Sequence, residues 1–316
     1  MKPLVPATGH EYQVVHDTEY RYAYQASIGQ HYSHLTPRHM ANQEVLWHAL
    51  EFQPAPDEVI KSRDYYGNHC QTVLIQQAHD CLLVRAATLV RITERVLAPA
   101  HAAQAWERAL QASVFGQEAL EISDMRLPSP LTPLLDETHA YASRFLTQGR
   151  PWVEALLDLA CHIQSEFIYD PEATQVDTTL AEMLAMRRGV CQDFAHLMLS
   201  CLRSYKLPAR YVSGYLFNAP LPGVPKLVGS DASHAWVESW LPGLGWVGFD
   251  PTNGKLADHE FITIGWGRDY SDIAPLRGVV LGGGDHELDV RVTVSRMDET
   301  GLAAYASPQT QLDETA

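Results

Sequence analysis

The chain has 316 residues, more than the ~100 to 200 residues of one average domain, so its length predicts two folded units. Apolar residues make up 46% and charged residues 19%, which is an ordinary balance for a folded protein and excludes disordered and fibrous classes. Acidic side chains outnumber Lys plus Arg by 38 to 23, so the surface should repel a phosphate backbone and we expect no nucleic acid partner.

The first hundred residues have the pattern of an antiparallel β protein. From Tyr12 to Tyr24, aromatic and β-branched residues recur at every second position, which is typical of a strand. Further strand-like runs cover 45–52, 59–65, 72–76 and 82–92. We therefore predict an N-terminal β-sandwich over residues 1–97.

The composition changes after residue 97, where an Ala-rich stretch and a Pro-rich connector (127–133) mark the expected domain border. Apolar residues at helical spacing then predict an amphipathic helix from Trp152 to Phe167. We expect a second folded core over 98–297, and a small, polar tail over 298–316 that is flexible.

Two helices are expected around the middle of this core. Thr179 and Glu182 have the spacing of a capping box, in which each side chain satisfies a backbone N–H, so a short helix should follow and stop near Gly189. Apolar residues then recur at helical spacing from Cys191 to Tyr205, and Pro208 ends the pattern. Cys191 is therefore expected on the first turn of a buried helix.

Period-two patterns return after Pro208. They predict strands over 209–217, 233–241 and 246–250, and the alternation from Leu288 to Val294 predicts a last strand.

The cysteines and the apolar stretches indicate the cellular compartment in which the protein is expected. There are five cysteines, an odd number without a C-x-x-C spacing, which argues against a disulfide framework and a zinc site. Reduced thiols are typical of the cytosol. The N-terminus lacks the apolar run of a signal peptide, and no stretch approaches the ~18 apolar residues of a membrane span. We expect a cytoplasmic protein with no membrane partner and no bound metal or other cofactor; the oligomeric state is left open.

Cys191 is the candidate nucleophile. A thiol attacks as the thiolate, which a helix N-terminus and an adjacent imidazole both favour. The other four cysteines are interpreted as small buried hydrophobic residues.

The segments around Cys191 carry a family resemblance. RRGVCQDFAHLMLSCLRSYKLPARYVSGYL, DASHAWVESW and GWVGFDPTNG closely resemble the core of the transglutaminase-like superfamily, a branch of the papain-like thiol enzymes. GRDYSDIAPLRGV and the DYYGN segment of the first domain resemble bacterial members with an N-terminal β-sandwich. The resemblance implies an α+β fold in which the helix bearing the cysteine packs on an antiparallel sheet bearing a histidine and an aspartate.

The resemblance assigns Cys191 as nucleophile, His234 of SHAW as general base and Asp250 of FDPTNG as the acid that orients the histidine. Each role makes chemical sense, because imidazole can take the thiol proton and return it to the leaving group, while a carboxylate fixes the imidazole tautomer. His196 lies about 140° around the helix from Cys191, so we interpret it as a structural histidine.

Acyl transfer also needs donors for the oxyanion. The backbone N–H of Cys191 is one candidate. In the family an aromatic residue upstream of the cysteine can supply another, and Tyr169 in FIYDPEAT stands at that place. Gln192 and Trp236 are weaker candidates for the oxyanion site or the cleft.

The triad imposes a strand register. A four-residue turn that pairs Leu241 with Trp246 would put Asp250 on the face opposite His234, whereas pairing Trp240 with Trp246 brings both to one face. We predict the second register, through a longer loop or a bulge.

The sequence thus predicts a thiol enzyme that forms a thioester with a Gln side chain or a peptide carbonyl, resolved by water or by an amine. Its partner is a peptide or protein substrate. The alternative is a non-catalytic binding or assembly module on the same scaffold. Calcium is not implied, because no acidic loop of EF-hand type occurs.

Overall fold

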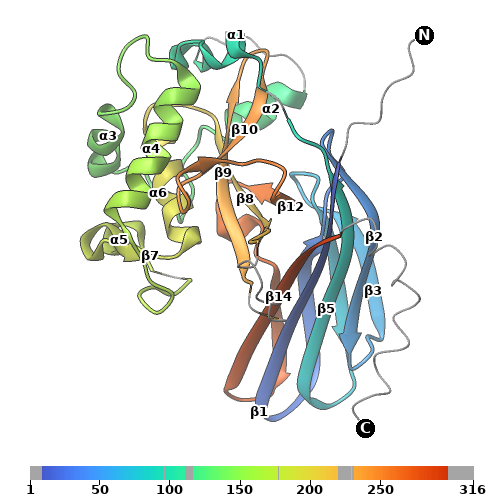
Figure 1. The fold of residues 1–316 in the computed structure, drawn as a ribbon. Coiled ribbons are helices and arrows are strands. Elements are labelled where there is room, and N and C mark those ends of the chain that lie inside the picture. Colours follow the sequence, from blue (N-terminus) through green and yellow to red (C-terminus); the bar gives the residue numbers. More distant parts are fainter. Residues whose placement is uncertain are drawn as a thin grey trace, which may run out of the picture.

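A computed structural model describes residues 9–95, 97–110, 117–176, 178–219, 229 and 231–297. These residues form a mixed α+β protein with two large antiparallel sheets, one N-terminal and one within the helical core (Figure 1). The predicted fold class is confirmed.

The first sheet is built on one very long strand. Its members are β1 (His10–Thr36), β2 (Gln43–Gln53), β3 (Glu58–Arg63), β4 (His69–Ile75), β5 (His79–Ile92), β13 (Leu276–Gly282) and β14 (His286–Met297). The order is β2-β5-β1-β4-β3, and β13 and β14 also pair with β1. The N-terminal half of β1 pairs with β5 and β14, and its C-terminal half pairs with β4 and β13.

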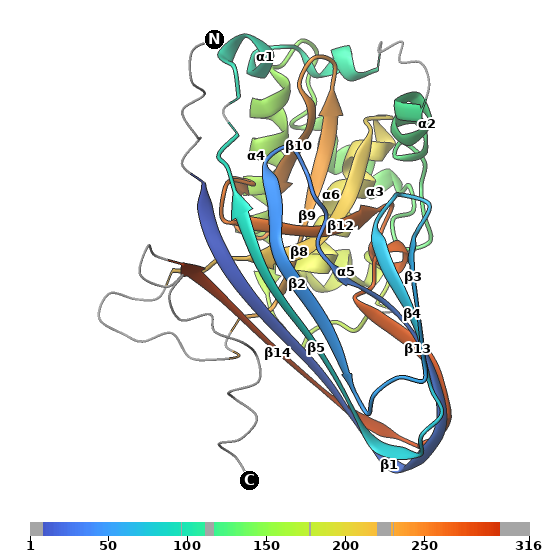
Figure 2. The ribbon, with the colours of Figure 1, turned by 90° about the vertical axis from the view of Figure 1, so that its right-hand side faces the viewer.

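This division of β1 folds the sheet into two layers, which meet near the bend of β1 in Figure 2. Between the layers lies a small apolar core from β1, β4 and β5, which contains Leu35, Val73, Ile75, Leu82, Val84 and Ala86. The N-terminal domain is therefore a β-sandwich, as predicted.

The last two strands depart from the predicted domain limits. The strand expected from Leu288 to Val294 is present as part of β14, but β13 and β14 complete the N-terminal sheet. Residues 276–297, which we expected in the core of 98–297, therefore belong to the sandwich. The tail predicted over 298–316 lies outside the described residues.

The second sheet carries the strands expected after Pro208. It has the order β11-β10-β9-β8-β12, formed by β8 (Ala209–Leu216), β9 (Ser233–Leu241), β10 (Gly245–Asp250), β11 (Lys255–Leu256) and β12 (Phe261–Gly267). A separate parallel pair joins β6 (Ile168–Tyr169) to β7 (Arg188–Gly189).

The helices lie around this sheet, and those of the main core cover the face that points away from the sandwich (Figure 1). They are α1 (Pro99–Ala102), η1 (Trp106–Ala109), α2 (Gln117–Asp124), α3 (Asp136–Ser143), α4 (Trp152–Glu166), α5 (Leu180–Met186), α6 (Cys191–Ser204) and η2 (Tyr270–Asp272). The apolar face predicted for α4 packs with α6 and with β9 and β10 in the main core. The capping box at Thr179 is present, and α5 ends at Arg187, which has φ of 54°.

The two bodies share a second apolar cluster. Ile262 and Ile264 of β12 and Tyr215 of β8 pack against residues of the sandwich, which are Tyr12, Val14, Val90, Ile92, Val292 and Val294. The sandwich therefore packs on the sheet that carries the candidate site.

Candidate active site

The first turn of α6 fixes the position of Cys191. The buried Asp193 carboxylate accepts a 2.8 Å hydrogen bond from the N–H of Val190 and a 2.6 Å bond from the hydroxyl of Thr174. A Cβ at Gly189 would lie 2.6 Å from the same carboxylate, so only glycine fits there. Burial raises the pKa of Asp193. The thiol of Cys191 is half-buried at the helix start.

The hairpin of β9 and β10 has the predicted register. Trp246 pairs with Trp240, and the ladder continues to Phe249 opposite Val237. The ladder begins with Gly245 opposite Leu241, so the turn holds only residues 242–244, and the longer loop or bulge that we predicted is absent from this hairpin. Gly243 and Gly245 have φ of 78° and 74°, which a residue with a side chain rarely adopts, and they make this tight turn possible.

His234 and Asp250 consequently meet on one face of the sheet. The Nε2 atom of His234 lies 2.8 Å from Oδ2 of Asp250, whose side chain has no exposed surface. The carboxylate also accepts hydrogen bonds from the backbone N–H groups of Thr252 and Asn253 and from the Asn253 side-chain amide. Burial opposes its charge, but these donors outweigh burial and lower the pKa of Asp250.

Two neighbours of His234 oppose the effect of its burial on its pKa. Burial alone would lower its pKa, yet the hydrogen bond to Asp250 and a hydrogen bond to Cys191 raise the pKa of His234 to about 10. Because Nε2 faces the carboxylate, Nδ1 is the ring nitrogen left for the thiol. The structure thus brings thiol, imidazole and carboxylate into one chain of contacts.

The three secondary candidates lie in different surroundings. Tyr169 is 50% exposed on β6, and both burial and the neighbouring Cys191 raise the pKa of its hydroxyl. The Gln192 amide donates to the carbonyl of Val176 at 3.5 Å. Trp236 is buried and stacked behind the His234 ring, at 6.2 Å between ring centroids.

Tyr211 is a neighbour of the site that sequence patterns missed. It is buried on β8, and the pKa of its hydroxyl is raised first by burial and then by the nearby Cys191. In the sequence it is one aromatic residue of a strand, and no local signal separates it from a packing residue.

His196 is structural, as predicted. It is buried, and its Nε2 accepts a 3.2 Å hydrogen bond from the backbone N–H of Tyr270. Burial lowers its pKa to about 4, so the ring is neutral at physiological pH.

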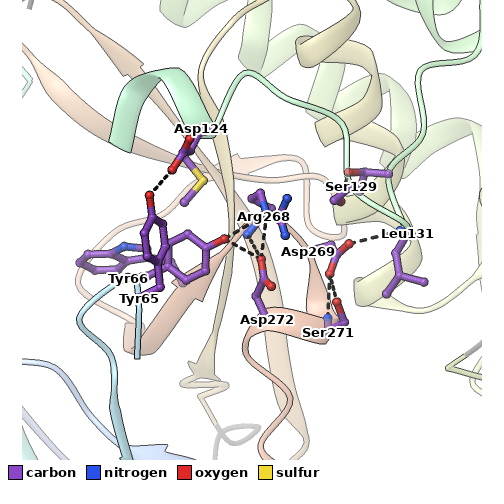
Figure 3. A network of polar contacts seen from close by, with 12 residues as sticks. Tyr65, Tyr66, Asp124, Ser129, Leu131, Arg268, Asp269, Ser271 and Asp272 are labelled. Atoms are coloured by element: carbon purple, nitrogen blue, oxygen red, sulfur yellow. Dashed lines mark hydrogen bonds and ion pairs between the residues drawn. The ribbon is translucent and has the colours of Figure 1, made fainter. Parts of the chain in front are cut away.

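The GRDYSD and DYYGN segments meet each other beside the core (Figure 3). Arg268 donates to the hydroxyl of Tyr66 at 3.0 Å and forms an ion pair with Asp272. Asp269 is fully buried and accepts hydrogen bonds from Ser271 and from the N–H of Leu131. The contacts of Tyr66 with Arg268 and Asp272 join the sandwich to the core, whereas those of Asp269 lie within the core.

The Asn68 side chain adds a strand-like contact. Its amide donates to the carbonyl of Trp266 at 2.7 Å, and its oxygen accepts from the Trp266 N–H at 3.0 Å. The hairpin residues of DYYGN therefore have an interface role beyond the turn.

Over the described ranges, no group of three or more His, Cys, Asp or Glu side chains could hold a metal ion. Across the same part of the chain, no helix is long and apolar enough to cross a membrane.

The fold and the contacts of Cys191 define a papain-like α+β core joined to a β-sandwich. The transglutaminase-like superfamily matches residues 139–251, and the bacterial transglutaminase-like N-terminal region matches residues 12–91. The chain belongs to the transglutaminase-like superfamily.

Several known proteins are similar to all or part of this chain. An uncharacterized protein of Mycobacterium tuberculosis H37Rv is 37% identical over 309 residues, which cover 95% of this chain and 98% of the relative. A protein-glutamine gamma-glutamyltransferase of Pseudomonas aeruginosa is 37% identical over 106 residues, or 33% of this chain and 16% of that protein. A crystal structure from Cytophaga hutchinsonii, described as that of a candidate cysteine protease, has a TM-score of 0.74 and 20% identity and covers 92% of this chain and 91% of that one. The last similarity shows the fold alone.

Proposed function

We propose that the protein is a thiol enzyme that transfers acyl groups, with Cys191 as nucleophile, His234 as general base and Asp250 as the orienting acid. The observation that carries the proposal is the position of His234, which contacts both Asp250 at 2.8 Å and Cys191. A buried imidazole with a carboxylate on one nitrogen and a thiol on the other is the arrangement that nucleophilic thiol catalysis needs.

The reaction begins when His234 takes the proton of the Cys191 thiol and the sulfur attacks the carbonyl carbon of a Gln side chain or a peptide. A C–S bond forms, and the carbonyl electrons move to oxygen. When they return, the C–N bond breaks and the leaving amine takes its proton from the His234 imidazolium. The product is a thioester on Cys191.

Water or a second amine then attacks the thioester. His234 takes a proton from the attacking group, the C–S bond breaks, and the thiol is restored. Water is the default acceptor unless the site excludes it. Amide hydrolysis of a peptide or protein substrate is therefore our first expectation, with transfer to an amine as the alternative outcome.

Two groups are proposed to stabilise the oxyanion. The Cys191 N–H lies at the start of α6, where it has no partner within the helix. Tyr169 is the second, since its hydroxyl is half-exposed and within electrostatic reach of the thiol. A donor of this kind typically contributes roughly 2.7 to 4 kcal/mol to the transition state.

A substrate screen tests the proposal. Peptide, isopeptide and Gln side-chain amides would be incubated with and without an added amine, and the Cys191→Ala variant serves as the control. We expect ammonia release or peptide cleavage in the parent protein and neither in the Cys191→Ala variant. We also expect a thioester on Cys191 itself, found on the fragment of the enzyme that contains this residue. A parent protein that neither turns over any of these amides nor reacts at Cys191 with an amide-mimicking electrophile would favour a non-catalytic scaffold.

A further inference from the structure

The sandwich contacts the segment that leads into His234. β14 pairs with β1 along one edge, from Glu11 opposite Met297 to Tyr22 opposite His286. Its other edge holds Gly229 and Asp231, which come just before β9. A strand of the N-terminal sheet thus lies directly beside the approach to the candidate general base.

Asp231 is fastened to β14 through both its backbone and its side chain. Its N–H donates to the carbonyl of Val292 at 2.9 Å, and its carboxylate accepts from the N–H of Val294 at 2.8 Å. The N–H of Gly229 donates to the hydroxyl of Thr293 at 2.7 Å. The Asp231 carboxylate therefore takes the place of a strand partner at the backbone N–H of Val294 in β14.

The anchor point on β14 is itself rigid. Val292 and Val294 have no exposed surface, and they pack in the cluster that joins the sandwich to β8 and β12. Closely packed residues of this kind move little, because a shift would open cavities on both sides.

Little chain separates this anchor from His234. Three residues span at most ~10 Å, so a displacement of Asp231 would be felt at the imidazole. Ser233 already pairs with Tyr215 in the second sheet. The Tyr215 hydroxyl also meets the sandwich, through a 2.8 Å hydrogen bond with Nδ1 of His16. The start of β9 is thus tied to the sandwich on two sides.

We propose that the sandwich is part of the catalytic apparatus, because β14 holds Asp231 and thereby positions His234 against Cys191. Asp231 is a positioning residue, which acts on His234 through the start of β9. This inference rests on the proposed function of His234. A displacement of about 1 Å in a catalytic group can cost on the order of 10²-fold in rate.

Three variants separate positioning from general stability. Asp231→Ala removes the acceptor for the Val294 N–H, whereas Asp231→Asn keeps an oxygen there. Thr293→Val removes the acceptor for the Gly229 N–H at nearly constant shape and provides a second route if Asp231→Ala fails to fold. Glu287→Ala, at an exposed acidic residue of the same strand, is the matched control.

The first readout is the rate at which iodoacetamide alkylates Cys191, measured from pH 5 to pH 10 beside thermal melting. We expect the rate at neutral pH to fall about 10- to 100-fold in Asp231→Ala and less in Thr293→Val. The pH profile of Asp231→Ala should approach that of His234→Ala. Asp231→Asn should recover most of the parental rate, and the control should equal the parent. Folded Asp231→Ala and Thr293→Val proteins with parental rates and profiles would overturn the proposal.

A second readout does not depend on catalysis. Hydrogen exchange of the peptide that contains residues 232–237 should accelerate in Asp231→Ala relative to the control. If Cys191 of the parent proves unreactive, the proposed enzyme function fails, but faster exchange would still support the anchor. Unchanged exchange in a folded Asp231→Ala protein would reject the anchor whatever the activity.

Discussion

Replacement of Asp250 by asparagine is the sharpest test of the charge arrangement at the site. The carboxylate has no exposed surface and accepts hydrogen bonds from His234 and from Asn253 on the same oxygen, at 2.8 and 2.6 Å. An asparagine keeps the shape, but an NH₂ group at this oxygen would face two donors. To avoid that clash, His234 must release the Nε2 proton and carry it on Nδ1, the nitrogen that faces Cys191. The base would then be in the wrong tautomer.

The expected magnitude follows from the histidine. The rise in its pKa from 6.5 to about 10 corresponds to about 5 kcal/mol in favour of the imidazolium, shared between Asp250 and Cys191. In serine-enzyme triads the same exchange lowers kcat by about 10⁴-fold through the wrong tautomer. We expect turnover by Asp250→Asn to fall on the order of 10³- to 10⁴-fold and alkylation of Cys191 at pH 7 to fall at least about tenfold.

The assay combines alkylation kinetics with thermal melting, and Asp80→Asn, at an exposed position of β5, is the matched control. Two donors left facing each other in a buried site cost about 1 to 3 kcal/mol of stability. An Asp250→Asn protein with the parental alkylation rate and melting temperature would refute the reasoning, because the carboxylate would then neither fix the tautomer nor stabilise the charge.

Further predictions concern the other groups of the site. Cys191 should be the first thiol that limiting iodoacetamide modifies. Of the other four cysteines, Cys70 and Cys201 are buried, whereas Cys81 is partly exposed and Cys161 is exposed, so the prediction of four buried cysteines is wrong for these two. Loss of solvation nevertheless raises the pKa of Cys81, Cys161 and Cys201; peptide mapping that finds Cys161 labelled faster would contradict this prediction. His234→Ala should abolish turnover, and a fully active His234→Ala protein would exclude His234 as the general base. His196→Ala should mainly lower the melting temperature, because the Tyr270 N–H loses its acceptor, which costs about 1 to 3 kcal/mol of stability. Tyr169→Phe should slow turnover about 10²- to 10³-fold at an unchanged melting temperature, and an unaltered kcat would remove Tyr169 from the oxyanion site. The folded pKa of His234 is raised to about 10, above its unfolded value of 6.5. The ion pair of His234 therefore contributes its full stability below pH 6.5, and this stability is lost as the pH rises through 10. The difference in melting temperature between the parent and His234→Ala should shrink between pH 7 and pH 10.

The sequence allowed the helix of Cys191 and the register of β9 and β10 to be predicted for separate reasons. The helix followed from local periodicity and from Pro208, which are properties of neighbouring residues. The register followed from requiring His234 and Asp250 to share a face, and the observed pairing of Trp246 with Trp240 agrees. The first prediction needed only neighbouring residues, whereas the second also needed the roles that the family resemblance gives to His234 and Asp250.

The partner of the last strand could not be predicted in this way. The alternation from Leu288 to Val294 shows that one face is buried, but it does not show against what. Pairing of β14 with β1 joins residues from opposite ends of the chain, and no periodicity encodes such a choice. The same limit applies to Asp231 and Tyr211, whose roles depend on strands that are distant in sequence.

The closure of the N-terminal sheet by β14 has a consequence for the order of synthesis. During synthesis, Cys191, His234 and Asp250 emerge from the ribosome before residues 286–297. The N-terminal sheet lacks its strand β14 until those residues have emerged. Contacts between such distant segments form slowly, since a long loop must close before they are gained. We expect the thiol of the nascent chain to be less reactive until residues 286–297 have been synthesised, so that a fully reactive cysteine appears only once β14 has joined the sheet.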